Sequence, residues 1–155
     1  MIIRRAEERD LEPLLDLYDQ LYDILIREHG FPFAFSRDEN RAVLSIQIKS
    51  RLCCIFVAEQ DNALLGFVHG SISKLDRRLT YQGEKVIARI DDVYVSPETR
   101  GTGVANALMQ EAEAWFRSEE VAGVESYIVS GNQQSLRFHQ KRGYEIIASR
   151  TIKPL

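Results

Sequence analysis

The chain has 155 residues, of which 45% are hydrophobic and 28% charged, and its formal net charge is -3. A domain of this length buries about 70% of its unfolded surface, so residues 1–155 are expected to form a single domain. The composition excludes disordered and collagen-like chains, and no apolar run approaches the roughly 20 residues of a membrane-spanning helix.

Net charge and the spacing of the histidines indicate which classes of ligand the chain can bind. The small negative charge and the lack of a basic cluster argue against a nucleic-acid partner and favour a cationic one. His29, His69 and His139 lie far apart in the sequence without metal-ligand spacing, so no metal site is predicted. Charges directly after a short apolar start are not typical of a signal peptide, and a cytoplasmic protein without membrane association is expected.

The N-terminal half is predicted from apolar periodicity and turn residues. Asp10 precedes a stripe of apolar side chains at helical spacing and is expected to cap that helix. Ser36 and Glu39 have the spacing of a capping box for the next helix. The predicted elements are a strand at 1–6, a helix at 11–25, a helix from 36 to about 50, and an antiparallel hairpin between 52 and 75 around the turn QDNA.

The C-terminal half alternates strands with helices. Its predicted elements are a strand at 85–95, a helix at 104–116, a strand at 124–129, a helix at 133–142 and a last strand at 144–152. The full order begins with antiparallel strands and passes into strand–helix–strand units. This order predicts an α/β fold with a mixed, mostly antiparallel central sheet and helices on both faces.

The turn before the helix at 104–116 has the features of an anion site. Gly101 and Gly103 allow a tight bend and a close approach to the backbone, and Arg100 adds a positive charge. No acidic residue follows until Glu111, although the first turn of a helix usually favours one. Free amides at an uncapped helix start bind phosphate well. The sequence therefore predicts a phosphate-bearing ligand here.

Two common phosphate-binding motifs are excluded. The turn lacks the Gly-Lys-Ser/Thr of a Walker A loop. A dinucleotide-binding motif would need a small residue at Asn106 and an acidic residue about 20 positions later, whereas Asp91 and Asp92 come before the turn.

Two spaced motifs carry a family resemblance. Arg100-x-x-Gly103-x-Ala105, after the strand IDDVYV, resembles the acetyl-coenzyme A (acetyl-CoA) loop of the GNAT superfamily of N-acetyltransferases. The segment NQQSLRFHQKRGYE resembles the second block of that family, with Asn132, Ser135, Phe138, Gly143 and Tyr144 in register. The resemblance implies that the chain is one GNAT domain with the acyl-CoA N-acyltransferase fold.

The resemblance also implies a binding site for acetyl-CoA as cosubstrate. The turn and helix start would hold the diphosphate, and the strand edge before them would pair with the pantetheine arm, where one amide acts as an oxyanion donor. Asn132 would reach the pantetheine, and its alternative role is the N-cap of the helix at 133–142. The cofactor-binding residues implied are Val93, Tyr94, Val95, Arg100, Gly101, Thr102, Gly103, Val104, Ala105, Asn132 and Ser135.

The implied chemistry is direct attack of an amine on the acetyl thioester. An amine with a pKa of ~10.4 is neutral in only about one molecule in 2,500 at pH 7, so a base must remove a proton. Asp91 and Asp92 stand where many family members carry acidic residues for this step. Strand alternation lets only one of them face the cleft unless a bulge intervenes. Asp91 is the first choice, and the alternative is a surface or capping role for both.

One position departs from the family pattern. His139 occupies the place of the tyrosine that usually protonates the departing thiolate. A neutral imidazole can still donate a hydrogen bond, so His139 is predicted to replace the tyrosine, and the alternative is altered catalysis. If His139 acts as a charged acid, kcat should fall above pH ~7 and His139→Gln should abolish that fall.

The acceptor is predicted to be the amine of a small molecule. The region of the first two helices offers aromatic and acidic side chains, namely Tyr18, Tyr22, Phe31, Phe33, Phe35, Asp19, Asp23 and Glu28. They could wrap a cation with an apolar body, or the phenylalanines could pin the loop to the core. The short last segment suggests that part of the acceptor wall comes from a second copy, so a homodimer is a hypothesis.

Two other functions stay open from the sequence. One is acetylation of a protein N-terminus or a lysine side chain. The other is a non-catalytic acyl-CoA sensor module in which the binding loop is intact and proton handling has decayed.

Overall fold

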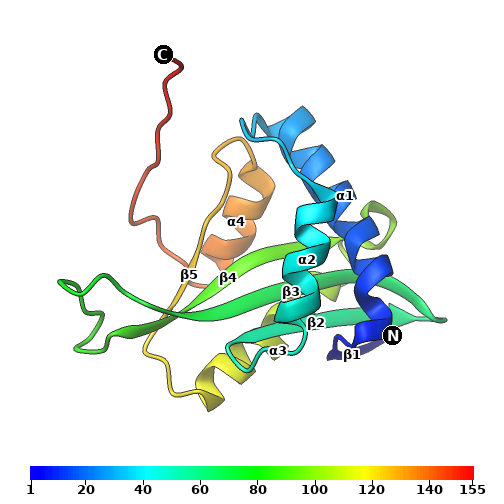
Figure 1. Ribbon diagram of the computed structural model, residues 1–155, viewed down its shortest axis with the longest axis horizontal. Helices are drawn as coiled ribbons and strands as arrows, with labels where there is room; N and C mark the ends of the chain where they lie inside the picture. The colour runs from blue at the N-terminus through cyan, green and yellow to red at the C-terminus, as the bar shows by residue number, and fades with distance from the viewer.

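The computed structural model describes residues 1–155 and contains a five-stranded sheet with helices on both faces. Figure 1 shows α1 and α2 in front of the sheet and α3 behind it. In chain order the elements are β1 (Ile2–Arg5), η1 (Glu8–Asp10), α1 (Leu11–His29), α2 (Arg37–Gln47), β2 (Cys53–Gln60), β3 (Ala63–Lys74), β4 (Val86–Val95), η2 (Pro97–Thr99), α3 (Val104–Ser118), β5 (Val124–Ser126) and α4 (Gln133–Lys141).

The strands follow one another across the sheet in the order β1-β2-β3-β4-β5. The first three pairs are antiparallel, and β4 with β5 is parallel. The parallel pair extends only from Ala88 opposite Val124 to Ile90 opposite Ser126. Beyond Ile90 the two strands separate. The predicted mixed, mostly antiparallel sheet is therefore confirmed.

Two apolar layers form the core, one on each face of the sheet. Because side chains alternate along a strand, Phe67 joins Leu14 and Tyr18 of α1, whereas the next residue, Val68, joins Leu108 of α3. Phe138 of α4 packs against the α3 layer. The predicted placement of helices on both faces is confirmed.

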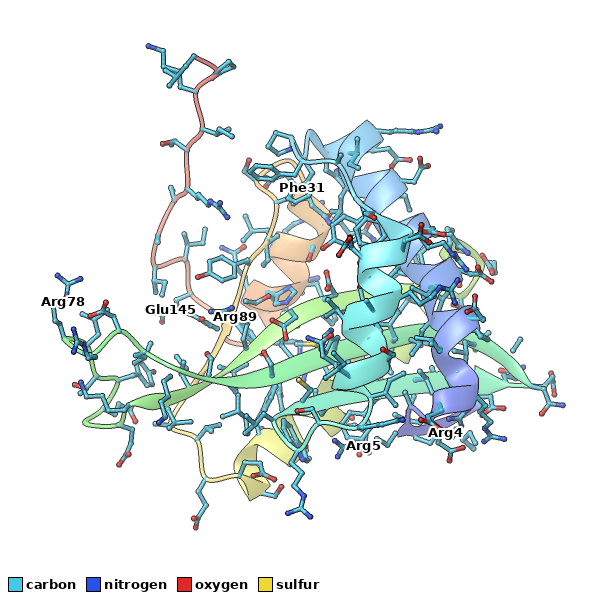
Figure 2. The ribbon with its side chains drawn as sticks, viewed as in Figure 1. Arg4, Arg5, Phe31, Arg78, Arg89 and Glu145 are labelled. Carbon is cyan, nitrogen blue, oxygen red and sulfur yellow. The ribbon has the colours of Figure 1, made fainter.

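Two glycines permit close approaches between elements. A Cβ at Gly70 would lie 2.5 Å from Cζ of Phe116, so this position lets α3 pack closely on β3. A Cβ at Gly131 would clash with the backbone carbonyl of His29. The end of α1 therefore lies directly against the loop that leads into α4. Figure 2 shows Phe31 at this end of α1.

The predicted last strand at 144–152 is wrong. These residues form no strand, and Ile146, Ile147 and Ile152 are exposed. Figure 1 shows the end of the chain leading away from the sheet. A strand needs a partner to satisfy its backbone groups, and apolar β-formers alone do not supply one. The strand predicted at 124–129 is shorter for a related reason, since β5 ends at Ser126 where β4 leaves it.

Asp10 does not cap α1 as predicted. Its side chain makes no hydrogen bond to the start of that helix. The carboxylate instead accepts two bonds from Arg4, at 2.7 and 2.8 Å, and one from the amide of Glu7 at 2.7 Å. A buried carboxylate needs a charged partner, and Arg4 lies within reach. The cap of α2 is found, because Ser36 Oγ accepts from the amide of Glu39.

Candidate active site

A β-bulge brings both neighbouring aspartates to the same face of the sheet. His69 pairs with Asp92 and Gly70 pairs with Ile90, so Asp91 is an extra residue on β4. Asp92 lies opposite His69, on the face that α1 covers. Asp91 Oδ2 lies 4.0 Å from His69 Nε2 and therefore reaches the same face. The bulge thus removes the restriction that strict alternation would impose.

The aspartates belong to a cluster of ionisable side chains under α1. Tyr18 packs on Phe67 with ring centroids 4.4 Å apart and hydrogen-bonds through its hydroxyl to His69 Nδ1 at 2.9 Å. Tyr22 lies beside Tyr18, and both tyrosines lie near Asp92. Burial, followed by the charge of Asp92, holds the pKa of both tyrosines above the usual value, so both keep their protons at neutral pH.

The pKa of Asp92 lies near neutral pH. Burial and then the nearby charge of Asp91 raise the pKa of Asp92 to about 7, while the nearby hydroxyls of Tyr18 and Tyr22 oppose the shift. A general base works best with a pKa near the operating pH. Burial lowers the pKa of His69, so this imidazole is neutral at the same pH.

The turn between β4 and α3 has free backbone donors. Gly101 and Gly103 adopt left-handed backbone angles, with φ of 78° and 93°. The amides of residues 101–106 donate to no backbone carbonyl, and α3 has no side-chain cap and no acid in its first turn. Such a helix start binds an anion. Arg100 is exposed and folds back, since its Nε donates to the carbonyl of Val95 at 3.1 Å.

The end of β4 has one free edge. Val93, Tyr94 and Val95 pair with Val68, Phe67 and Gly66 on β3. On the other side no strand pairs with them, because β5 has already separated. An extended ligand can add to such an edge as a further strand.

A groove of about 690 Å³ lies between α3 and α4. It is lined by Asn106, Gln134, Arg137, Phe138, Lys141 and Arg142. Three of these side chains are basic, which suits the phosphates of a nucleotide. The groove adjoins the first turn of α3, so it lies next to the free amides at that helix start.

Asn132 and Ser135 form the start of α4. Asn132 Oδ1 accepts a hydrogen bond from the amide of Ser135 at 3.1 Å. Asn132 is therefore the N-cap of α4, which was the alternative role open from the sequence.

His139 is buried inside the interface between α4 and β5. Its Nδ1 donates to the carbonyl of Ser135 at 2.9 Å, and Ser126 Oγ lies 3.3 Å from Nε2. Phe138 and Tyr144 pack edge-on against the ring. Burial lowers the pKa of His139, so the imidazole is neutral at pH 7 and Nε2 is left as an acceptor for Ser126.

The aromatic residues of the first helices pack on one another. Tyr22 stacks on Phe35 with centroids 4.0 Å apart, and Phe31 meets Tyr22 and Phe33 edge-on. These contacts tie the loop between α1 and α2 to the core. The acidic side chain of Asp19 in turn pairs with Arg37.

Sequence reasoning missed the part that Tyr18 and His69 play around the aspartates. Tyr18 appeared as one member of an apolar stripe, and His69 as one of three scattered histidines. The available signal was a lone polar ring at an inward position of a strand, two residues after Phe67. The bulge on β4, which brings Asp91 to that ring, leaves no mark in the sequence.

The structure contains no group of three His, Cys, Asp or Glu side chains that could hold a metal ion. None of the helices has both the length and the apolar character needed to cross a membrane.

The geometry defines a class of α/β domain in which two parallel strands part beside an uncapped helix start. The model of the acetyltransferase (GNAT) family matches residues 18–144. The chain belongs to this family.

Individual relatives agree with that membership. An uncharacterized N-acetyltransferase of Methanocaldococcus jannaschii is 25% identical over an alignment of 148 residues, and the match covers 92% of this chain and 60% of that protein. The chain thus spans less than two thirds of the length of that relative.

Solved structures share the fold. A tetramutant of a Bacillus halodurans protein has a TM-score of 0.85 at 18% identity, with 100% of both chains covered. An aminoglycoside N-acetyltransferase in complex with CoA has a TM-score of 0.77 at 22% identity, covering 99% of this chain and 93% of that one.

Proposed function

We propose that this chain is an N-acetyltransferase that transfers the acetyl group of acetyl-CoA to a primary amine of a small molecule, by direct attack in a ternary complex. The observation that carries the proposal is the bulge at Asp91. It brings two carboxylates to the face of β4 that α1 covers, next to the free edge at Val93–Val95.

The residues present fit acetyl-CoA. The free amides of residues 101–106 supply donors for a diphosphate, and the basic groove between α3 and α4 supplies charge for further phosphate. The unpaired edge of β4 supplies donors and acceptors for the amides of the pantetheine arm. The family match and the fold of a CoA-bound acetyltransferase support the same ligand.

When bound, acetyl-CoA supplies an activated acetyl thioester, whose carbon–sulfur bond breaks as the bond to the amine nitrogen forms. The chain must first convert the acceptor from ammonium to amine. The carboxylate pair Asp91 and Asp92 accepts that proton, and with its pKa of about 7 Asp92 returns it to solvent readily. The second proton lost by the nitrogen balances the one that the thiolate gains. A free amide at Val93–Val95 donates to the thioester oxygen.

The role of His139 stays a prediction. Its position matches the family tyrosine, but its Nδ1–H is engaged by Ser135 and its pKa is lowered by burial. A thiol of pKa about 8.5 leaves largely unaided at neutral pH. We therefore propose that His139 acts as a neutral group that fixes Ser126 at the opening of the strands, rather than as a charged acid.

A small-molecule acceptor is supported by two observations. Asp92 lies beneath the hydroxyls of Tyr18 and Tyr22 and is half-buried, so the acceptor nitrogen must reach a recessed carboxylate. The structurally similar CoA-bound protein is an aminoglycoside N-acetyltransferase. A compact amine on a flexible body reaches such a place more easily than a folded protein surface.

Release of free thiol from acetyl-CoA across an amine panel tests the proposal. The panel contains aminoglycosides, polyamines, amino acids and peptides with free N-termini. Thiol release with at least one small amine, reduced at least tenfold in an Asp91→Asn/Asp92→Asn double variant, is the expected result. Release with peptides alone would favour a protein acetyltransferase, and tight CoA binding without any release would favour a sensor module.

A further inference from the structure

His69 is a buried histidine with one unpaired ring nitrogen. The residue is 4% exposed and lies in the middle of β3. Its Nδ1 contacts the hydroxyl of Tyr18 at 2.9 Å, whereas Nε2 has no hydrogen-bond partner. Asp91 Oδ2 is also buried and unpaired, and it faces Nε2 at 4.0 Å. Two unpaired polar atoms that face each other require an explanation.

The Tyr18 contact decides which ring nitrogen carries the proton. Tyr18 is held protonated by burial, so its O–H donates to Nδ1 of the neutral ring. The proton of a neutral imidazole then resides on Nε2. The resulting N–H faces the Asp91 carboxylate across 4.0 Å. The reverse tautomer would set a nitrogen lone pair against that carboxylate.

Resting on the proposed acetyltransferase function, we propose that Tyr18 and His69 form a positioning pair that assigns separate roles to the two aspartates. Tyr18 fixes the Nε2–H tautomer of His69, the N–H keeps Asp91 as a standing anion, and the acceptor's proton therefore goes to Asp92. In this step an N–H bond of the ammonium breaks and an O–H bond forms on Asp92, which leaves the neutral amine.

The same arrangement also keeps Asp92 receptive to a proton. Because the Tyr18 hydroxyl is engaged by His69, it is less free to donate to Asp92, and the Asp91 anion adds repulsion. The pKa of Asp92, about 7, is raised by burial and by the charge of Asp91, and a Tyr18 hydroxyl that donates to His69 no longer lowers it. Two carboxylates in contact share a proton unless their surroundings differ, and the His69 N–H supplies that difference.

The other ionisable groups around the cluster do not replace His69. Arg89 on β4 is bound to Glu125 by two hydrogen bonds, at 2.9 and 2.8 Å. Figure 2 labels Arg89 on β4 near the point where β5 approaches it. The ionisable groups within electrostatic reach of Asp91 or Asp92 are Tyr18 and Tyr22 from α1, Cys53 and Cys54 from β2, His69 from β3 and Arg89 from β4.

Nuclear magnetic resonance tests the proposal without any acceptor. Protein with ¹⁵N-labelled histidine reports the tautomer of His69 through long-range correlations, and protein with ¹³C-labelled aspartate carboxyls reports where the neutral-pH proton resides. Asp91→Asn and Asp92→Asn assign the two carboxyl signals. His29→Gln, which removes a histidine remote from the aspartates, is the matched control.

In the native chain we expect the Nε2–H tautomer at His69 and a titration step near pH 7 on the Asp92 carboxyl. In His69→Leu we expect that step to move to Asp91, because Asp91 loses the N–H that faces it while Tyr18 is released to donate to Asp92. His69→Gln, which retains an N–H donor, should return the step to Asp92. Tyr18→Phe should leave His69 as a mixture of tautomers.

Three results would each overturn the proposal. They are an Nδ1–H tautomer of His69 in the native chain, a titration step near pH 7 on the Asp91 carboxyl of the native chain, and a step that stays on Asp92 in His69→Leu. If His69→Leu does not fold, Tyr18→Phe tests the pair through the tautomer, and a pure Nε2–H ring in that variant would overturn the proposal. Failure of the acetyltransferase function is a separate outcome, since it appears as absent thiol release while the proton pattern stays as described.

Discussion

The buried carboxylate of Asp92 reduces the stability of the fold at neutral and alkaline pH. Its pKa in the folded chain is about 7, against ~3.9 for an unperturbed aspartate. Between these values the folded chain holds a proton that the unfolded chain has lost. The free energy of unfolding is therefore highest, as far as Asp92 is concerned, below pH ~4. It falls as the pH rises toward 7, because the unfolded chain releases this proton more easily than the folded chain does. A buried charge that the fold disfavours but retains is typical of a functional site.

Asp92→Asn is accordingly expected to stabilise the protein at alkaline pH. The neutral amide avoids the burial of a carboxylate, so Tm at pH 8 should rise by about 3 °C or more, with little difference at pH 4. Thermal unfolding at the two pH values measures this. Asp61→Asn, which removes an exposed turn carboxylate, is the control. A lower Tm at pH 8, or a gain that does not depend on pH, would contradict the account.

The pKa shifts of Asp92 and His139 predict that kcat/KM rises with pH and does not fall again just above neutrality. Asp92 must be ionised to act as a base, so kcat/KM should rise through pH ~7 and then level off. Because burial lowers the pKa of His139, no fall due to this residue is expected just above pH 7. His139→Gln should keep the shape of the profile. A falling limb in the native enzyme that disappears in His139→Gln would instead establish His139 as a charged acid.

At the level of elements, α3 is specialised at its first turn. The lack of a cap and of acidic residues leaves its amides free, although an acid there would stabilise the helix itself. Helix stability and anion binding therefore make opposite demands at the same position.

Asn106→Asp distinguishes the effect on helix stability from the effect on anion binding, because it adds a negative charge to the first turn of α3 with little change in side-chain shape. The new carboxylate should repel the diphosphate, by about 1 kcal/mol or more, and raise the Kd for CoA about fivefold. Since Arg142 already donates to Asn106 Oδ1 at 3.1 Å, the fold should tolerate the change and Tm should not fall. Gln110→Glu, the same change one turn later, is the control. Calorimetric titration with CoA giving equal affinities for the two variants would contradict the anion site.

The contact between α1 and the loop before α4 depends on a missing Cβ. Gly131→Ala would clash with the carbonyl of His29, and a backbone atom cannot move aside as a flexible side chain does. We expect a loss of about 1–3 kcal/mol and a Tm lower by several degrees. Ser130→Ala, an exposed neighbour in the same loop, should change Tm little. Equal Tm values in both variants would show that this approach is looser than described.

At the level of the whole molecule, local signals predicted most elements but not their ends. Helical stripes and the hairpin turn located α1, α2, α3, α4 and the β2–β3 pair, because these depend on near neighbours. The strand at 144–152 was wrong because a strand depends on a distant partner. The two family motifs predicted membership of the acetyltransferase (GNAT) family, which the family match confirms. Neither the bulge at Asp91 nor the approach of Tyr18 to His69 could be predicted, since both arise from tertiary packing.

The exposed isoleucines after α4 bear on the assembly. Ile146 and Ile147 are adjacent in the sequence and are 63% and 86% exposed, so they form an apolar pair at the surface. We expect a homodimer that covers them, measurable by light scattering. Ile146→Lys/Ile147→Lys should then give a monomer, whereas Leu79→Lys, an exposed leucine in the β3–β4 connection, should not. A native monomer at high concentration would contradict the homodimer.

The central claim is that the two aspartates that the bulge on β4 brings to one face of the sheet deprotonate an amine beside bound acetyl-CoA. Thiol release from acetyl-CoA across the amine panel, with native protein and Asp92→Asn side by side, tests it most directly. We predict amine-dependent release by the native protein and at least a tenfold lower rate in Asp92→Asn, with the affinity for CoA unchanged. Amine-dependent release at equal rates in both proteins would contradict the claim.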